Sequence, residues 1–144
     1  MTADLDAYRT PDTVDYIVAA LAPLMRSASE RATDDEFPFA LVTLINGVDN
    51  PESGGSDDVI QVDYLDRARD GMEAIATASA TARSGHRRIL RLARHEVGVT
   101  ISDGSTVFAD YLKVRQKPTP QPYANDSVRR LVARYDVGLA FVTD

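Results

Sequence analysis

Residues 37–66, FPFALVTLINGVDNPESGGSDDVIQVDYLD, hold two apolar runs around a polar segment, and this stretch decides the fold. The first run, Phe37 to Ile45, is apolar on both alternating faces, which is typical of a central strand covered on both sides. The second run, Val59 to Asp66, alternates apolar with polar residues and predicts a strand with one buried face. Its inward side chains are then Ile60, Val62 and Tyr64, and its outward ones Gln61 and Asp63. Between the runs, Asn46 to Asp58 has the Asn, Gly, Pro and Ser content of a loop, so the stretch predicts a hairpin with a long, acidic, mobile tip.

A helix is expected before this hairpin. Thr10 is a suitable N-cap and Pro11 a suitable first helical residue. Pro23 lacks an amide hydrogen, so the helix should end near Leu21 or Ala22. The stripe expected to be buried consists of Val14, Ile17, Val18 and Leu21. The flanking segments are expected to be a flexible N-terminal segment at residues 1–10, a short edge strand at Leu24 to Ala28 and a loop at Ser29 to Glu36.

The segment from Arg67 to Arg94 predicts the main helix. Small and apolar residues recur in it at alternating steps of three and four, which places them on one face. They are Ala68, Gly71, Ile75, Ala78, Ala82, Gly85, Ile89 and Leu92. Because Ala and Gly make a poor coiled-coil seam, packing on the sheet is favoured over a coiled coil. Ser84-Gly85 is expected to break or bend the helix, since Gly disfavours a helix by roughly 1 kcal/mol relative to Ala.

After this helix the pattern returns to strands. Val97 to Ile101 and Thr106 to Val114 flank Asp103-Gly104, a strong hairpin signal. Lys117 to Ser127 holds three prolines and predicts an extended loop. The final segment, Val128 to Val142, predicts an amphipathic strand. Its apolar face holds Leu131, Ala133, Tyr135, Val137, Leu139 and Phe141, and its polar face holds Arg130, Arg134 and Asp136.

The order of these elements is helix, strands, long helix, strands. It predicts a single α+β domain over residues 1–144, with a mostly antiparallel sheet packed against two helices.

Composition restricts the possible functions. The chain has 144 residues, no cysteine and a formal net charge of −6. Without cysteine there is no disulfide, thiol nucleophile or thiolate zinc site. The acidic balance argues against a protein that reads DNA or RNA sequence, but it permits one that lets DNA slide past. No apolar run approaches the roughly 20 residues that cross a bilayer, and no basic segment opens the chain, so neither a membrane span nor a signal peptide is expected.

Candidate catalytic groups are few. His95-Glu96 begins like the zinc-protease motif HExxH, but the second histidine position is Val99. A divalent-metal cluster can be drawn from Asp57, Asp58, Asp63 and Asp66. However, Asp63 and Asp66 are three residues apart in a strand, hence on opposite faces, so solvated acids are the favoured interpretation. Neither an enzyme nor a cofactor is therefore expected.

Five stretches carry a resemblance to a known family by their order and spacing. They are FPFALVT at 37–43; the acidic Gly-rich loop leading into VIQVD at 59–63; the Arg- and Ala-rich helix from Asp66; the strand Val107 to Val114; and Pro122-Tyr123 leading into VRRLVARYDV at 128–137. With the leading amphipathic helix, residues 12–143 resemble the tail terminator proteins of long-tailed, siphovirus-type bacteriophages. The sequence departs from that pattern by extra length at Ser29 to Glu36 and at His86 to Gly98.

The resemblance implies an α+β subunit that assembles into a ring, typically six-fold, at the head-proximal end of the virion tail. Such a ring caps the finished tail tube, stops tail elongation and provides the head–tail joining surface. The partners it implies are further copies of the chain, the major tail tube protein and a head–tail connector or stopper protein, assembled in the host cytoplasm. Phage DNA passes through the lumen without specific binding, and acidic walls would let it slide.

Candidate assembly contacts follow from charge and position. The acids of the predicted tip suit a segment that orders on binding, and two arginines of the final strand suit pairing with acids of an adjacent subunit. The residues are Asp49, Glu52, Asp57 and Asp58 in the tip, Tyr123 in the Pro-rich loop, and Arg130 and Arg134. Two alternatives stay open: another neck or tail protein, such as a head completion or connector protein or a tail tube subunit, and, less favoured, a divalent-metal nuclease using Asp57, Asp58 and Asp63.

Overall fold

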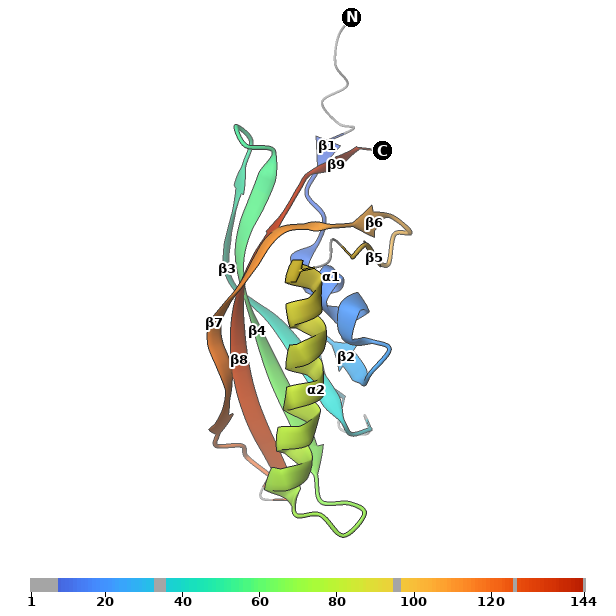
Figure 1. The fold of residues 1–144 in the computed structure, drawn as a ribbon, viewed down its shortest axis with the longest axis vertical. Coiled ribbons are helices and arrows are strands. Elements are labelled where there is room, and N and C mark those ends of the chain that lie inside the picture. Colours follow the sequence, from blue (N-terminus) through green and yellow to red (C-terminus); the bar gives the residue numbers. More distant parts are fainter. Residues whose placement is uncertain (1–7, 33–35, 95–96, 126, 144) are drawn as a thin grey trace, which may run out of the picture.

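A five-stranded sheet is the main element of the computed structural model, which describes residues 8–32, 36–94, 97–125 and 127–143 (Figure 1). The strands, in spatial order, are β2 (Arg26–Ala28), β3 (Phe39–Asn50), β4 (Gly55–Arg67), β8 (Val128–Leu139) and β7 (Ala109–Gln121). All neighbours are antiparallel except β2 and β3, which are parallel. The predicted α+β fold with a mostly antiparallel sheet is confirmed.

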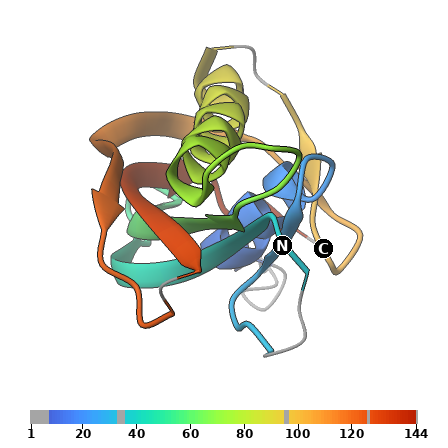
Figure 2. The same ribbon diagram turned by 90° about the horizontal axis from the view of Figure 1, so that it is seen from below.

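Two helices, α1 (Thr13–Leu21) and α2 (Ala74–Arg94), lie on the same side of this sheet (Figure 1). Figure 2, seen along the strands, shows α2 in yellow-green on one side of the curled sheet. Both helices and the sheet face beneath them bury one continuous hydrophobic core. Its largest fully buried side chains include Tyr16, Ile17 and Leu21 of α1, Ile89 of α2, and Tyr64 and Tyr135 of the sheet.

Helix α1 begins two residues later than a Thr10 cap would require. Asp12 is its N-cap, because the Asp12 carboxylate accepts a hydrogen bond from the backbone N–H of Asp15 at 3.2 Å. The predicted Thr10 cap is therefore wrong, whereas the predicted end at Leu21 is confirmed. The buried face is also rotated from the predicted stripe. Ile17 and Leu21 are buried, but their buried companions are Tyr16 and Ala20, while Val14 and Val18 are half-buried.

Helix α2 begins at Ala74 rather than at Arg67, because β4 continues to Arg67 and a turn follows. Asp70 and Gly71 in that turn have positive φ angles of 52° and 77°. The predicted stripe is buried from Ala78 to Leu92, and α2 packs on the sheet as predicted. The predicted break at Ser84-Gly85 is wrong, since the helix is continuous through both residues.

The β3–β4 ladder is longer than predicted. It continues from the pair Asn46↔Val59 to the pair Asn50↔Gly55, and residues 51–54 form the turn. The prediction of a long loop over Asn46 to Asp58 is therefore wrong, although the hairpin itself is confirmed. The prediction that β3 is covered on both sides holds only at its start, because residues 43–50 are exposed.

Part of the predicted loop at Lys117 to Ser127 also belongs to a strand. Strand β7 pairs with β8 as far as Gln121↔Arg130. It accommodates Pro118 and Pro120 because it is an edge strand, where the missing donor can face away from the sheet. The predicted loop is therefore confirmed only after Gln121.

The smaller elements flank this sheet. The predicted edge strand is confirmed as β2, and the hairpin around Asp103-Gly104 as β5 (Val99–Thr100) and β6 (Thr106–Val107). Near the two described ends of the chain, β1 (Tyr8–Arg9) pairs with β9 (Val142–Thr143), so the predicted final strand is divided between β8 and β9. Two residues of the expected flexible segment 1–10 are thus paired, and residues 1–7 lie outside the described part. No helix among the described residues is long and apolar enough to cross a membrane.

Gly85 is predicted to be essential for the contact between α2 and the sheet. A Cβ at this position would overlap Cε1 of Tyr64 and lie 3.0 Å from its Cζ. Gly85→Ala should therefore lower the free energy of unfolding by about 1–2 kcal/mol, because overpacking outweighs the gain in helix propensity. Denaturant unfolding measures this. The exposed neighbour provides the control, since Ser84→Ala should leave stability unchanged or raise it; a Gly85→Ala protein as stable as the parent would refute the contact.

Candidate functional site

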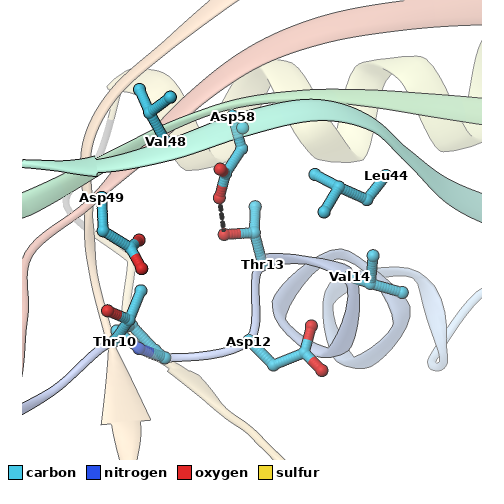
Figure 3. Close-up of a pocket in the computed structure, with 10 residues that line it drawn as sticks. Thr10, Asp12, Thr13, Val14, Leu44, Val48, Asp49 and Asp58 are labelled. Carbon is cyan, nitrogen blue, oxygen red and sulfur yellow. Dashed lines mark hydrogen bonds between the residues drawn. The ribbon is translucent and has the colours of Figure 1, made fainter.

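The β3–β4 hairpin carries the four acidic residues predicted as assembly contacts. It extends beyond the ends of both helices (Figure 1). Glu52 lies in its turn, where the side chain of Asn50 accepts hydrogen bonds from the backbone N–H groups of Glu52 and Ser53 at 3.0 and 3.3 Å. Asp49 and Asp58 lie on the side that faces α1, as Figure 3 shows. The structure thus brings the four residues together on one protruding element.

A cavity of about 380 Å³ lies at the base of the hairpin, between β3, β4 and the start of α1 (Figure 3). The hydroxyl of Thr13 donates a hydrogen bond to the carboxylate of Asp58 and so ties the first turn of α1 to the hairpin. Asp49 points into the same space (Figure 3). The described lining includes these acids and Asp12 but no basic residue, so the cavity is acidic.

The acids of the hairpin influence one another. Burial raises the pKa of Asp58, and the charges of Asp49 and Asp57 raise it further, while the hydrogen bond from Thr13 opposes them. On the other face of the hairpin, Asp57 accepts a hydrogen bond from the Tyr111 hydroxyl. Burial and this bond raise the pKa of Tyr111 to about 12. The hairpin therefore concentrates negative charge on both of its faces.

The three carboxylates of the alternative nuclease site do not converge. The Asp57 carboxylate accepts a hydrogen bond from Tyr111, and that of Asp58 accepts one from Thr13. Asp63 forms an ion pair with Arg130. Across the part of the chain that the structure describes, no three or more His, Cys, Asp or Glu side chains are grouped so that they could hold a metal ion. The geometry gives the nuclease alternative no support.

Asp63 and Asp66 are buried, so the prediction that they are solvated is wrong, although Asp63 does lie on the outward face of β4, away from the helices, as predicted. They do lie on opposite faces of β4. Asp63 is 5% exposed and meets the guanidinium of Arg130 at 3.3 Å. Asp66 is fully buried and accepts hydrogen bonds from the hydroxyl of Thr81 at 2.6 Å and from the guanidinium of Arg69 at 2.8 Å. Both acids therefore serve the packing of this subunit.

Arg130 and Arg134 lie on the sheet face opposite the helices, as predicted. Each has a partner on the neighbouring strand: Arg130 pairs with Asp63, and Nε of Arg134 donates to the side-chain oxygen of Gln61 at 3.1 Å. Both arginines are half-buried. A contact with another subunit would have to share or replace these pairs.

Tyr123 lies far from the hairpin, at the other end of the sheet. It packs against a small cluster formed by Phe39, Leu65 and Val128. It also lines a second cavity, of about 470 Å³, together with Phe37 and two arginines. The predicted contact residues therefore fall into three regions: the hairpin, the open face of the sheet, and its far end.

One feature of the hairpin was not predicted. Leu44, Ile45 and Val48 of β3 are 50%, 45% and 61% exposed, and the outer edge of β3 beside them is unpaired in the described residues. An apolar residue, Val48, stands beyond Ile45 within the segment of loop-like composition, and this was the available signal. Asn46-Gly47 obscured it, because this dipeptide is typical of a turn.

Comparison with protein-family models gives no match for this chain, and comparison with curated proteins gives none either. What the site can do therefore follows from its geometry: an acidic, protruding hairpin with an unpaired edge, and a sheet face lined by cross-strand pairs.

The raised pKa of Asp58 predicts a stabilising substitution. A folded-state pKa above the ordinary 3.8 means that the folded chain binds this proton more tightly than the unfolded chain. The stabilisation that comes from this tighter proton binding is present in full below the pKa that Asp58 has in the unfolded chain. It is lost as the pH rises through the higher pKa that Asp58 has in the folded chain. Asp58→Asn should therefore raise the unfolding midpoint at pH 7, with a benefit that shrinks as the pH approaches 3.8. Thermal unfolding across this pH range measures it. Glu73→Gln, at an exposed residue before α2, controls for the loss of one charge, and a benefit that grows on acidification would contradict the prediction.

Proposed function

We propose that this chain is a non-enzymatic structural protein of a virion: a tail terminator that forms a ring on the head-proximal end of the tail tube. The observation that best supports this is the architecture. One sheet carries its helices on a single side, and each of its two edges is unpaired over part of its length within the described residues. A ring of identical subunits needs two different surfaces on every copy, and two open edges offer them.

The hairpin suits contact with the tube or with the connector. It protrudes beyond the helices, and Asp49, Glu52, Asp57 and Asp58 give it a uniformly negative surface. Tyr123, Arg130 and Arg134 are further proposed contacts of the ring. The net charge of −6 supports passage of DNA through the lumen, because like charge disfavours binding of phosphate.

In this proposal the partners are further copies of the chain, arranged in a ring with the six-fold symmetry that the resemblance implies, together with the major tail tube protein and a head–tail connector or stopper protein. The ring is assembled in the host cytoplasm and remains in the virion tail. Its action is mechanical, since occupying the tube end blocks addition of the next tube subunit.

In a tube assembly reaction, this chain is expected to stop the elongation of tail tubes early. Adding the chain to growing tail tubes should halt elongation, and electron microscopy of tube lengths measures this. Asp49→Asn/Glu52→Gln should need at least tenfold more protein for the same effect, because it removes two charges from the hairpin. Asp70→Asn/Glu73→Gln removes two exposed charges from the turn before α2 and should act like the parent.

Three outcomes would overturn the proposal. The first is tubes of undiminished length with the chain present in excess. The second is polymerisation of the chain alone into long tubes, which indicates a tube subunit. The third is binding to heads but not to tube ends, which indicates a connector protein.

A further inference from the structure

We propose that copies of this chain join edge to edge, with the open half of β3 in one copy pairing antiparallel with the open half of β7 in the next. This deepens the proposed function by naming the ring interface, and it rests on the ring-forming part of that proposal. The open half of β3 comprises residues 43–50, and the open half of β7 comprises residues 109–116.

The outer edge of β3 is covered only where the strand begins. Strand β2 pairs with it from Arg26↔Phe39 to Ala28↔Leu41. Beyond Leu41, β3 continues to Asn50 with β4 on its inner side and, among the described residues, no strand on its outer side. A strand edge of this length presents unpaired backbone N–H and C=O groups, which readily accept another strand.

The open half of β3 is also apolar. Leu44, Ile45 and Val48 belong to it and are between 45% and 61% exposed. Natural edge strands that stay unpaired usually carry charges, prolines or bulges that prevent pairing. This edge has one bulge, between Leu44 and Asn46, and one charged residue, Asp49, so it is weakly protected.

The other edge of the sheet is protected at the opposite end of its strand. Pro118 and Pro120 of β7 have no backbone donor, so this part of the edge cannot form a continuous ladder. Residues 109–116 contain no proline, so each keeps its backbone donor; the pairing of this stretch with β8 has two irregularities, between Ala109 and Tyr111 and between Val114 and Gln116. Residues 109–116 are also level with the open half of β3, because the ladders run Thr43↔Gln61↔Arg134↔Gln116 across the sheet. Both edges are thus blocked in the same half of the sheet and open in the other.

Strand direction fits such a joint. Since β3, β4, β8 and β7 are successively antiparallel, β3 and β7 run in opposite directions. A second copy placed beside the first by rotation about an axis along the strands keeps those directions, so β7 meets the next β3 antiparallel. The two surfaces are different, and a contact between different surfaces propagates from copy to copy until the rotation closes a ring.

Charge supports a second copy as the occupant. Residues 43–58 hold four acids, Asp49, Glu52, Asp57 and Asp58, and no basic residue. The open half of β7 holds Lys113 and Arg115 with a single acid, Asp110. The two edges therefore have opposite charge, which favours unlike over like edges in the joint.

Two variants, each with one blocked edge, test the proposal. Ile45→Lys/Val48→Lys alters exposed residues of the β3 edge, and Lys113→Glu/Arg115→Gln reverses the net charge of the open half of β7. Sedimentation of the concentrated protein, free and bound to tail tubes, should show at least tenfold weaker association for either variant alone. An equimolar mixture should form dimers and nothing larger, because one intact β3 edge meets one intact β7 edge.

Leu24→Lys/Met72→Lys, at residues 43% and 45% exposed, is the matched control and should assemble like the parent. Thermal unfolding verifies that each variant is folded.

The contrary outcomes separate this inference from the proposed function. Folded variants that assemble and cap tubes like the parent overturn edge pairing and leave the terminator proposal standing. Association of the Lys113→Glu/Arg115→Gln variant with itself at parental strength overturns the β3–β7 joint in favour of β3 pairing with β3. A parent chain that stays monomeric both in solution and on tube ends overturns the joint and the ring together.

Discussion

The close contact between α2 and Tyr64 is the constraint on which the rest of the structure depends. Gly85 lets the Tyr64 ring lie directly against the helix backbone. The hydroxyl of Tyr64 lies 3.1 Å from that of Tyr135, which in turn lies 2.7 Å from Nδ1 of His86 on the same helix. Burial raises the pKa of both tyrosines well above the ordinary value, so both hydroxyls stay neutral. Because Tyr64 is on β4 and Tyr135 on β8, one turn of α2 fixes two neighbouring inner strands of the sheet.

This anchoring leaves the ends of the sheet with different environments. At the end where α2 begins, Asp66 is held by Thr81 of the helix, and Phe39, Leu65 and Val128 form a second small core on the opposite face. At the other end, the β3–β4 hairpin extends past both helices, and a hydrogen bond from Thr13 to Asp58 ties its base to α1. The hairpin is therefore free to present its edge and its charges to another molecule, while the rest of the sheet keeps its shape.

The periodicity of the apolar residues predicted the architecture. The predictions that failed rested on the ordinary preferences of single residue types, such as glycine, asparagine and aspartate. The apolar faces of β4 and β8 and the buried stripe of α2 follow from spacing alone, because burial on one side imposes a period. Helix propensity alone predicts a break at Gly85. The propensity of a residue describes the helix by itself and takes no account of the Tyr64 ring, which needs the space that a side chain at position 85 would occupy. The Asn, Gly, Pro and Ser content of Asn46 to Asp58 predicts a loop, although pairing along β4 keeps most of this segment in strands. The burial of Asp63 and Asp66 depends on partners from distant segments, Arg130 and Thr81, which one sequence does not reveal.

The acidic residues of the hairpin repel one another in the free subunit, and an assembled ring would reduce this repulsion. Burial and the charges of Asp49 and Asp57 raise the pKa of Asp58, so the ionised form of Asp58 is disfavoured where it stands. In the proposed joint, Lys113 and Arg115 of the next copy lie along the β3 edge of the same hairpin and offset that repulsion. Exposed charges separated by more than about 8 Å are screened at physiological salt, so only close contact brings this relief. The acids that repel one another within one subunit thus attract the basic residues of the next subunit. This attraction favours pairing of the β3 edge with the β7 edge, the contact between unlike edges that a closed ring requires.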